Sequence, residues 1–458
     1  MTHDRWLQGE HAVIGLGRSG EAVSRLLRSH HARVYASDAG SSPALMRVAE
    51  SLRAVGAQVD VGHHDLARVA AASTVIVSPG VPPDAEVLQR ARAAGVPIVS
   101  EIEVALSFMP GLRYIAVTGT NGKSTVTALV AHLLRALGMP ADATGNIGQA
   151  VSGLALQYPP PTWTAIELSS FQLHDTPSVR PDVGILTNLA PDHLDRYPSV
   201  AEYYADKRAL FRNATSRSRW VVNADNAEAM EMVRGVDGVV QRYSARGRLC
   251  DAFYDRKGGQ LIVLDAPLIA RSDLPLLGDH NVGNALAAAL AVMLADADFR
   301  TLAARERIAA GLRSVKPLAH RLETVGVHGG VAWIDDSKAT NVASATVGVW
   351  SMDRPTVLLL GGKHKGESYK ALIEPIRARC HHTIAYGAAA SLIMEDLAGE
   401  VAIERVDGPF EMVMARARQL ARPGDAVLLS PACSSYDMFS NFEERGQRFA
   451  LLARGSAT

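Results

Sequence analysis

The stretch from Ile115 to Leu137 constrains the fold of this chain more than any other part of its sequence. A short apolar run ends in a glycine-bounded turn, and Gly-Lys-Ser-Thr then opens a helical pattern. In such a turn the backbone N–H groups and the helix N-terminus point at one place, which makes a cradle for an anion. The stretch therefore predicts a strand, a phosphate loop and a helix within an α/β domain.

The predicted phosphate loop also supplies charge and a metal ligand. It consists of Gly119, Thr120, Asn121, Gly122, Lys123, Ser124 and Thr125. Its lysine suits the β- and γ-phosphates of a nucleotide, and the hydroxyl that follows suits Mg²⁺. The alternative, a glycine turn with a surface lysine, is disfavoured because the lysine opens a helix directly after a buried-type strand. The loop is a shorter variant of the usual one, which would have glycine in place of Val117.

Length, charge and cysteine content restrict the class of protein. A chain of 458 residues is expected to hold about three domains. Lys and Arg together number 47, as do Asp and Glu, and this zero net charge argues against a nucleic-acid partner. The three scattered cysteines fit a reducing compartment better than a disulfide framework or a zinc site. The N-terminus shows no signal peptide and no apolar run reaches membrane-spanning length, so we expect a cytoplasmic protein without membrane insertion.

The first 104 residues have the pattern of a nucleotide-binding α/β unit. A short apolar strand leads into the glycine triplet that begins at Gly15, and a second strand ends about 20 residues later at Asp38. This spacing is typical of a dinucleotide fingerprint, although plain strand–helix–strand packing remains an alternative. A further apolar run ends at 78–80, where a turn at the carboxyl end of a strand can bind a ligand.

The second unit places two metal-binding residue types on the side of the phosphate loop. One predicted strand runs into Glu167, and the next is followed by His193. A carboxylate and an imidazole at these strand ends suit a divalent ion that bridges phosphates. The alternatives are a surface acid and a loop histidine with ordinary partners. Lys207 lies on a predicted helix, where from the residues alone a solvated lysine is expected.

The remainder of the chain continues the α/β pattern. Residues 240–270 resemble short antiparallel strands with a hairpin turn at Gly258-Gly259, and an alanine-rich helix is expected from Val282 to Leu294. Asn281 and Asn284 could read a purine edge or cap that helix. We predict three α/β domains: a Rossmann-like domain at 1–104, a central P-loop-type ATPase domain with a parallel sheet at 105–316, and a Rossmann-like domain at 317–458.

Several motifs together resemble those of the Mur ligases, which use ATP to join an amino acid to a carboxylate. The match is close to full length, and it rests on the phosphate loop, Glu167 to Leu173, Asp192 to Tyr197, His320-Arg321, Asp336 to Asn341, Ser430 to Cys433 and Asn441 to Glu443. The resemblance implies a monomeric ligase that adds D-glutamate to UDP-N-acetylmuramoyl-L-alanine through an acyl phosphate in peptidoglycan synthesis. The same ligation with L-glutamate, or another Mur ligase substrate, is the alternative.

The resemblance also implies roles for individual residues, with two Mg²⁺ ions and ATP as co-substrate. Catalytic roles fall to Lys123, Glu167, His193, Lys207 and Lys338, the last of which would steady the phosphates or the acyl phosphate. ATP would be bound by the phosphate loop with Asn281, Asn284, Arg321 and Asp336. The metal ligands would be Ser124, Thr125, Glu167, His193 and Lys207, which would carry an N-carbamate. The UDP substrate would contact Arg18, Ser19, Asp38, Ser78, Pro79, Gly80, Asn146, Ser169, Gln172 and His193. Glutamate would contact Thr340, Lys365, Ser435, Tyr436 and Phe442.

Three departures from the family pattern affect the substrate sites. Ala39-Gly40 follows Asp38 where relatives can offer a hydroxyl and an arginine to uracil, so fewer uracil contacts are expected. The pair Lys363-His364 is more basic than the pair that is usual at this place in the family. In the glutamate pocket, Ser434 and Tyr436 replace the alanine and the apolar residue that usually flank the serine. Other classes of protein explain less of the sequence. An oxidoreductase has no use for the phosphate loop and the Glu167–His193 pair, and a transport or switch ATPase does not explain the last domain. A binding module without enzymatic activity would need none of these residues.

Overall fold

The computed structural model describes residues 3–192 and 196–455, and it contains three sheets in two compact units. The first unit consists of residues up to Leu274 together with Gly283–Ser314, and it holds the first two sheets. The second consists of Pro275–Val282 and the chain from Val315 onward, and it holds the third sheet. The described residues contain no helix with the length and apolarity needed to cross a membrane. The α/β class is confirmed.

The first sheet is parallel, and its strand order β3-β2-β1-β4-β5 places a topological switch point between β1 and β4. Its strands are β1 (Glu10–Ile14), β2 (Arg33–Asp38), β3 (Gln58–Val61), β4 (Thr74–Val77) and β5 (Ile98–Ser100). Its helices are α1 (Arg18–Ser29), α2 (Pro43–Ala54), α3 (Leu66–Ala70), α4 (Glu86–Ala93) and α5 (Glu101–Phe108), after the short 3-10 turn η1 (His3–Leu7). Open sheets of this kind bind ligands at the carboxyl ends of the strands beside the switch point.

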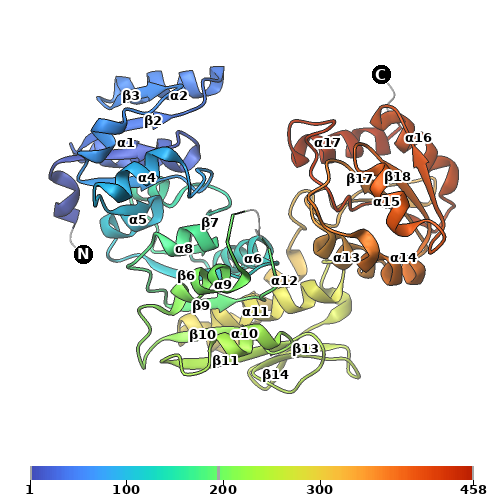
Figure 1. The fold of residues 1–458 in the computed structure, drawn as a ribbon. Coiled ribbons are helices and arrows are strands. Elements are labelled where there is room, and N and C mark those ends of the chain that lie inside the picture. Colours follow the sequence, from blue (N-terminus) through green and yellow to red (C-terminus); the bar gives the residue numbers. More distant parts are fainter. Residues whose placement is uncertain (1–2, 193–195, 456–458) are drawn as a thin grey trace. The chain divides into compact units, whose positions relative to one another are not determined.

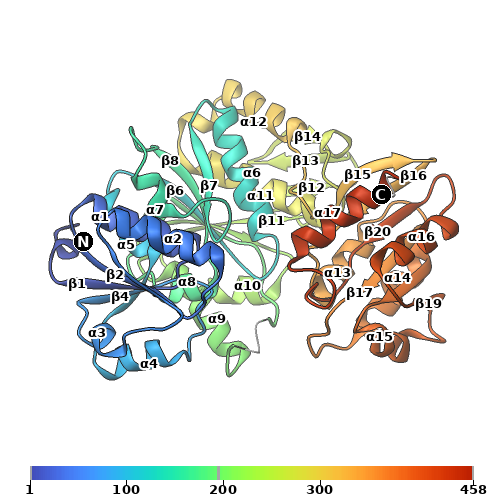
Figure 2. The ribbon, with the colours of Figure 1, turned by 90° about the horizontal axis from the view of Figure 1, so that it is seen from above.

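The alternating direction of the side chains along each strand explains why helices cover both faces of this sheet. Successive side chains of a strand point to opposite faces, so Val13 and Ile14 belong to different cores. The core that holds Val13 packs against α1, α2 and α5, whereas the core that holds Ile14 packs against α3 and α4. Figure 2 shows α1 and α2 on one side of the strands and α3 and α4 on the other.

The second sheet has the order β14-β13-β12-β11-β10-β9-β6-β8-β7. Its strands are β6 (Arg113–Thr118), β7 (Ala141–Gly145), β8 (Trp163–Glu167), β9 (Val183–Leu186), β10 (Arg219–Asn223), β11 (Val239–Ser244), β12 (Ala252–Asp255), β13 (Gln260–Val263) and β14 (Ala266–Ala270). Its helices are α6 (Lys123–Ala136), α7 (Val151–Ala155), α8 (Ser170–His174), α9 (Val200–Arg208), α10 (Ala227–Met232), α11 (Asp279–Ala295) and α12 (Leu302–Ser314). Strand β6, which leads into the phosphate loop, lies between β8 and β9.

Two sequence predictions need correction in this sheet. Antiparallel pairing was expected from residue 240, but β11 pairs in parallel with both β10 and β12, and only β12, β13 and β14 are antiparallel. The hairpin at Gly258-Gly259 joins β12 to β13 as predicted, and Gly259 has the positive φ that such a turn requires. Helix α11 begins at Asp279 instead of Val282, so Asn281 lies within it.

The third sheet forms the core of the second unit in the order β15-β16-β20-β17-β18-β19. Its strands are β15 (Glu323–His328), β16 (Val331–Asp335), β17 (Thr356–Gly361), β18 (Cys380–Tyr386), β19 (Ile403–Val406) and β20 (Ala426–Leu429). Its helices are α13 (Val342–Trp350), α14 (Ile373–Arg379), α15 (Ala390–Leu397), α16 (Phe410–Leu420) and α17 (Phe442–Ala453). Within this unit α16 and α17 lie on one side of β17 and β18, and α13 and α14 on the other (Figure 1).

Candidate active site

The phosphate loop takes its shape from two glycines whose backbone conformations exclude a side chain. Gly119 has a φ of +143°, and a Cβ atom there would lie 2.0 Å from Thr187 Oγ1. Gly122 is the N-cap of α6 with a φ of +83°. Lys123 then folds back and donates from Nζ to Gly119 O at 2.9 Å and to Thr120 O at 2.7 Å. The loop is thus a cradle of backbone groups with an ammonium group above it.

Two residues after β9 hold the tip of this loop, and sequence reasoning missed both. Asn188 accepts from the Asn121 backbone N–H at 2.9 Å and donates to Asn121 O at 3.0 Å. Thr187 Oγ1 donates to the same carbonyl oxygen at 2.6 Å. The sequence feature that could have identified them is the position of Thr187-Asn188 at the carboxyl end of a strand that pairs with β6. A polar pair at that place meets the loop that follows the neighbouring strand.

Glu167 has the burial and the free oxygen that a cation ligand requires. Its side chain is 2% exposed at the carboxyl end of β8. Oε1 accepts from Asn146 Nδ2 at 2.9 Å, whereas the buried Oε2 has no hydrogen-bond partner among the described residues. A buried carboxylate without a full set of partners is costly unless a cation completes it. Ser124, buried in the first turn of α6, adds a hydroxyl at the phosphate loop. These residues fit a divalent ion.

Lys207 is the largest departure from expectation. The sequence favoured a solvated helix lysine, but the side chain is only 1% exposed and the ammonium group donates to Gly119 O at 2.7 Å. Nζ also lies 4.6 Å from the centre of the Tyr203 ring. Burial, and then the nearby charge of Lys123, hold the pKa of Lys207 well below its usual value. The structure therefore places Lys207 at the phosphate loop. His193 lies outside the described residues.

A cavity of about 500 Å³ opens at the switch point of the first sheet. Seven of the residues predicted for the UDP substrate line this cavity: Arg18, Ser19, Asp38, Ser78, Pro79, Gly80 and Asn146. Three of these side chains also hold the backbone. Arg18 donates to Gly148 O at 2.6 Å, Ser78 Oγ donates to Gly15 O at 2.9 Å, and Asp38 accepts from the backbone N–H groups of Leu16 and Gly40.

Ser169 and Gln172 have a local role that the sequence prediction did not include. They form a capping box at the start of α8, in which Ser169 Oγ accepts from the Gln172 N–H and Gln172 Oε1 accepts from the Ser169 N–H. Gln172 also lines a second cavity, of about 700 Å³, that shares Ser78 and Pro79 with the first. Gln172 therefore faces space that a substrate can occupy.

The two asparagines of α11 are buried to the same degree, with 7% exposure each. Asn284 lies beside the phosphate loop, because a Cβ atom on Gly122 would be 2.8 Å from its Oδ1. Asn281 donates from Nδ2 to Leu277 O at 2.8 Å, which holds the segment that precedes α11. The structure thus supports a nucleotide-side position for Asn284 and a local structural bond for Asn281.

In the second unit the predicted residues lie in loops after three adjacent strands. Asp336 and Lys338 follow β16, Lys365 follows β17, and Ser435 follows β20. Lys365 donates from Nζ to Thr340 Oγ1 at 3.3 Å, and Ser435 is buried. Lys338 Nζ lies 5.1 Å from the centre of the ring of Phe442, the first residue of α17. Tyr436 is 68% exposed and does not join this group within its unit.

Asp336 combines burial with a short hydrogen bond. Its carboxylate accepts from Ser430 Oγ at 2.7 Å, and burial raises its pKa to about 7. This hydrogen bond and the charge of Arg321 oppose that rise. Asp336 and Arg321 therefore lie close enough to interact.

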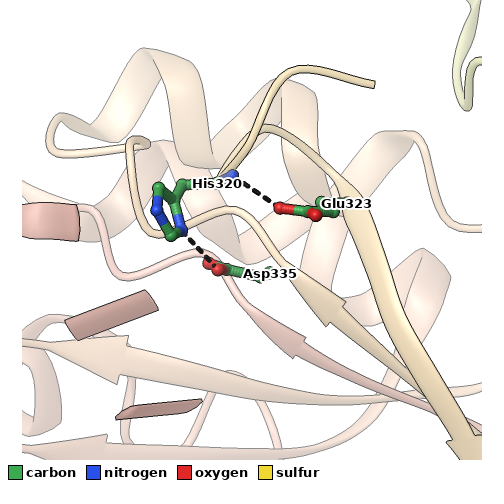
Figure 3. A group of neighbouring side chains, drawn as sticks. All are labelled: His320, Glu323 and Asp335. Carbon is green, nitrogen blue, oxygen red and sulfur yellow. Dashed lines mark hydrogen bonds and ion pairs between the residues drawn. The ribbon is translucent and has the colours of Figure 1, made fainter. Parts of the chain in front are cut away.

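A neighbouring group of His320, Glu323 and Asp335 has side-chain types that bind metals (Figure 3). His320 Nδ1 lies 2.7 Å from Asp335 Oδ2, and Glu323 Oε2 accepts from the His320 N–H at 3.0 Å. The hydrogen bond to Asp335 raises the pKa of His320. Because Asp335 Oδ1 also accepts from the Ser337 N–H, these groups satisfy one another, and their role is to fix the segments that carry Arg321 and Lys338.

Arg445 was not identified from the sequence, although it ties the predicted loops together. This arginine of α17 is fully buried. It donates from Nε to Ser337 Oγ at 2.9 Å, and from Nη2 to Ser337 O at 2.8 Å and to Cys433 O at 3.1 Å. Nη1 donates to Gly361 O at 3.4 Å. One guanidinium group thus joins the loops after β16 and β20 to the end of β17.

Comparison with known protein families gives matches in three consecutive regions of the chain. Residues 9–100 match "Mur ligase MurD-like, N-terminal domain", residues 117–292 match "Mur ligase middle domain", and residues 320–433 match "Mur ligase, glutamate ligase domain". Each match covers the part of the chain that forms one of the three sheets.

Comparison with individual proteins extends these matches to almost the whole chain. The UDP-N-acetylmuramoylalanine–D-glutamate ligase of Myxococcus xanthus is 38% identical, over 96% of this chain and 97% of that protein. The corresponding protein of Acidobacterium capsulatum is 36% identical, over 97% and 96%. Among solved structures, MurF from Acinetobacter baumannii aligns with a TM-score of 0.62 at 17% identity, over 93% of this chain and 94% of that one. MurC from Thermotoga maritima aligns with a TM-score of 0.60 at 18% identity, over 98% and 100%, and both show the shared fold.

Proposed function

The chain belongs to the Mur ligase family, and from this premise we propose that it adds D-glutamate to UDP-N-acetylmuramoyl-L-alanine with consumption of ATP. The observation that supports this most directly is the near full-length similarity to D-glutamate ligases. The site contributes chemistry of the right kind, since a glycine-shaped phosphate loop lies next to a buried lysine, Lys207, in one compact unit. The reaction is one of the cytoplasmic steps of peptidoglycan synthesis.

The proposed reaction has two transfers. The substrate carboxylate attacks the γ-phosphorus of ATP, which gives an acyl phosphate and ADP. The glutamate amine then attacks the acyl carbon, and inorganic phosphate leaves as the amide forms. The loop N–H groups and Lys123 hold the phosphates and offset their charge, while Ser124, Thr125 and Glu167 would hold Mg²⁺. When bound, the metal supplies positive charge against the transferring phosphoryl group.

We further propose that Lys207 carries an N-carbamate. Burial and the nearby charge of Lys123 lower the pKa of Lys207, which favours the neutral amine, and only the neutral amine has the lone pair that attacks carbon dioxide. The product is a carboxylate at the same position, which changes the side chain from an amine to an anionic metal ligand. His193 would complete this set of ligands through the family resemblance.

The loops of the second unit supply the remaining proposed contacts. Arg321, Asp336 and Lys338 are assigned to the nucleotide and the acyl phosphate. Lys365 pairs with a glutamate carboxylate, and Thr340, 3.3 Å from its ammonium group, donates a hydrogen bond to the same ligand. Ser435 and Phe442 complete the glutamate pocket. Tyr436, which is exposed, is the weakest of these assignments.

The deciding experiment measures phosphate release with each component omitted in turn. We expect release only when ATP, UDP-N-acetylmuramoyl-L-alanine and D-glutamate are all present, with L-glutamate, lysine and diaminopimelate as comparisons. Lys123→Ala should fold normally and lose activity at least about a hundredfold, because it removes a charge that stabilises the transferring phosphoryl group. Release without the UDP substrate, or a preference for another amino acid, would reject the proposed reaction.

A further inference from the structure

The cavity at the switch point of the first sheet is lined by one polar side chain that neither the sequence nor the family resemblance assigned. This is His64, which lines the cavity together with Asp38 and Ala39. It follows β3, whose carboxyl end lies beside that of β2 at the same sheet edge. We propose that His64 binds the uridine end of the UDP substrate through a hydrogen bond at Nε2. This inference rests on the proposed function.

The ring of His64 is held in place from one side. Its Nδ1 lies 2.8 Å from the hydroxyl oxygen of Ser37, which is fully buried on β2. The backbone on either side is also fixed, since the Gly62 N–H donates to Asp38 O and the Asp65 N–H donates to the Tyr35 hydroxyl. Because Nδ1 is engaged with the Ser37 hydroxyl, Nε2 is the ring nitrogen left for a ligand, as a donor in one tautomer and an acceptor in the other. His64 is therefore a preorganised hydrogen-bonding group at the cavity wall.

Protonation does not compete with this role at neutral pH. Burial lowers the pKa of His64, and the charge of Asp38 only partly opposes this effect. The imidazole is therefore neutral, with one donor and one acceptor nitrogen. Ribose hydroxyl groups and the uracil edge offer both acceptors and donors to such a ring, and a neutral ring costs less to bury against a nucleoside than a charged one.

The other polar side chains of the cavity are engaged elsewhere or suit the diphosphate. Each carboxylate oxygen of Asp38 accepts from a backbone N–H, Leu16 for one and Gly40 for the other, at 2.8 Å. Ser78 donates to a backbone carbonyl, and Asn146 donates to Glu167. Arg18 and Ser19 lie in the first turn of α1, where charge and helix N–H groups favour phosphate. Because Ala39 and Gly40 have no polar side chain, His64 is the polar side chain of this cavity that is available to bind the nucleoside.

The test compares binding of UDP with binding of inorganic pyrophosphate, which lacks the nucleoside, by calorimetry. We expect His64→Ala to weaken UDP binding about tenfold, the value of one good hydrogen bond, and to leave pyrophosphate binding unchanged. His63→Ala is the matched control, because His63 is an exposed neighbour whose 3.8 Å contact is with Asp60. Ser37→Ala should weaken UDP binding less than His64→Ala, since it only frees the ring. Unchanged UDP binding, or equal losses for both ligands, would overturn the proposal.

If His64→Ala does not fold, nitrogen NMR of the unmodified protein tests the same contact. The His64 Nε2 resonance should shift when UDP is added but not when pyrophosphate is added. A His64 resonance that does not shift when UDP is added would contradict the proposed contact. Failure of the proposed function is distinguishable, because the wild-type protein would then bind UDP through His64 and yet release no phosphate with the complete substrate set.

Discussion

At the scale of single residues, Glu101 is a buried acid that the proposed chemistry does not use. It lies at the start of α5, is 2% exposed, and accepts from the Ser152 N–H through Oε1, while Oε2 has no partner among the described residues. Burial raises its pKa to about 7 from 4.5. The native state therefore holds a proton that the unfolded chain releases, so stability falls as the pH rises through this interval.

We predict that Glu101→Gln removes this pH dependence. Wild-type and variant should be equally stable near about pH 5, and near about pH 8 the variant should be more stable by up to about 3 kcal/mol. Urea unfolding at both pH values measures the difference. Glu103→Gln is the control: Glu103 is as deeply buried, but it accepts from Ser178 and pairs with Arg5, so its replacement should destabilise. A wild-type stability that does not fall between these pH values would contradict the prediction.

Lys207 allows a prediction that separates stability from activity. Lys207→Met should abolish ligation while leaving the thermal midpoint unchanged or higher, because the apolar side chain removes the cost of burying an amine. Lys257→Met, at an exposed position of the same compact unit, should change neither quantity. Ligation and thermal unfolding measured on both variants provide the test. Small carboxylic acids should partly restore Lys207→Ala by replacing the carbamate, and an active Lys207→Met enzyme would refute the role.

The burial of Lys207 also shows where sequence reasoning reached its limit. A lysine near the end of a polar helix is usually solvated, and its sequence contains no sign of the opposite. Its burial depends on α9 packing beside the phosphate loop, which joins segments 88 residues apart. The phosphate loop itself was predictable because its strand, turn and helix are contiguous. Thr187 and Asn188 were missed for the same reason as Lys207.

At the scale of secondary structure elements, α17 stabilises the glutamate loops through Arg445. We predict that Arg445→Met destabilises the protein by about 3 kcal/mol or more, because it leaves several buried carbonyl oxygens without a donor. The KM for glutamate should rise as the loops after β16 and β20 loosen. Thermal unfolding and the KM for each substrate measure the two effects.

The same helix provides a matched control for Arg445. Arg448→Met removes an ion pair with Glu411 that is partly exposed, so it should cost less than about 1 kcal/mol and leave the KM for glutamate unchanged. Equal effects of the two substitutions would show that α17 as a whole, and not the Arg445 contacts, supports the loops.

Element types were more predictable than strand pairing. Parallel strands appear in the sequence as apolar runs followed by turns, and these patterns located the carboxyl ends of β1, β4, β6 and β8. Pairing partners were not encoded locally, which is why the parallel pairing of β11 with β12 was missed. The burial of Arg445 could not be predicted either, since an arginine within a helix is expected at the surface.

At the scale of the whole molecule, residues assigned to one reaction belong to two compact units. Lys123 and Lys207 lie in the first, and Lys338 and Lys365 in the second. Phosphoryl and acyl transfer need bonding distance between their reactants, so we predict that saturating ligands reduce the radius of gyration. Small-angle scattering with and without ATP analogue and UDP substrate measures this, with Lys123→Ala as the control that should respond less. Identical profiles would argue against ligand-driven closure.

One oxygen atom at the phosphate loop accepts from two lysines, Lys123 at 2.9 Å and Lys207 at 2.7 Å. A positive charge on Lys207 would be repelled by the ammonium group of Lys123, whereas an ammonium group and a carbamate attract. Each carbamate that forms on Lys207 thus adds an attraction to Lys123, and the protonated form of Lys123 favours its formation. Dissolved carbon dioxide then sets the fraction of molecules able to react, and a thoroughly degassed preparation should recover its activity when bicarbonate is returned to it.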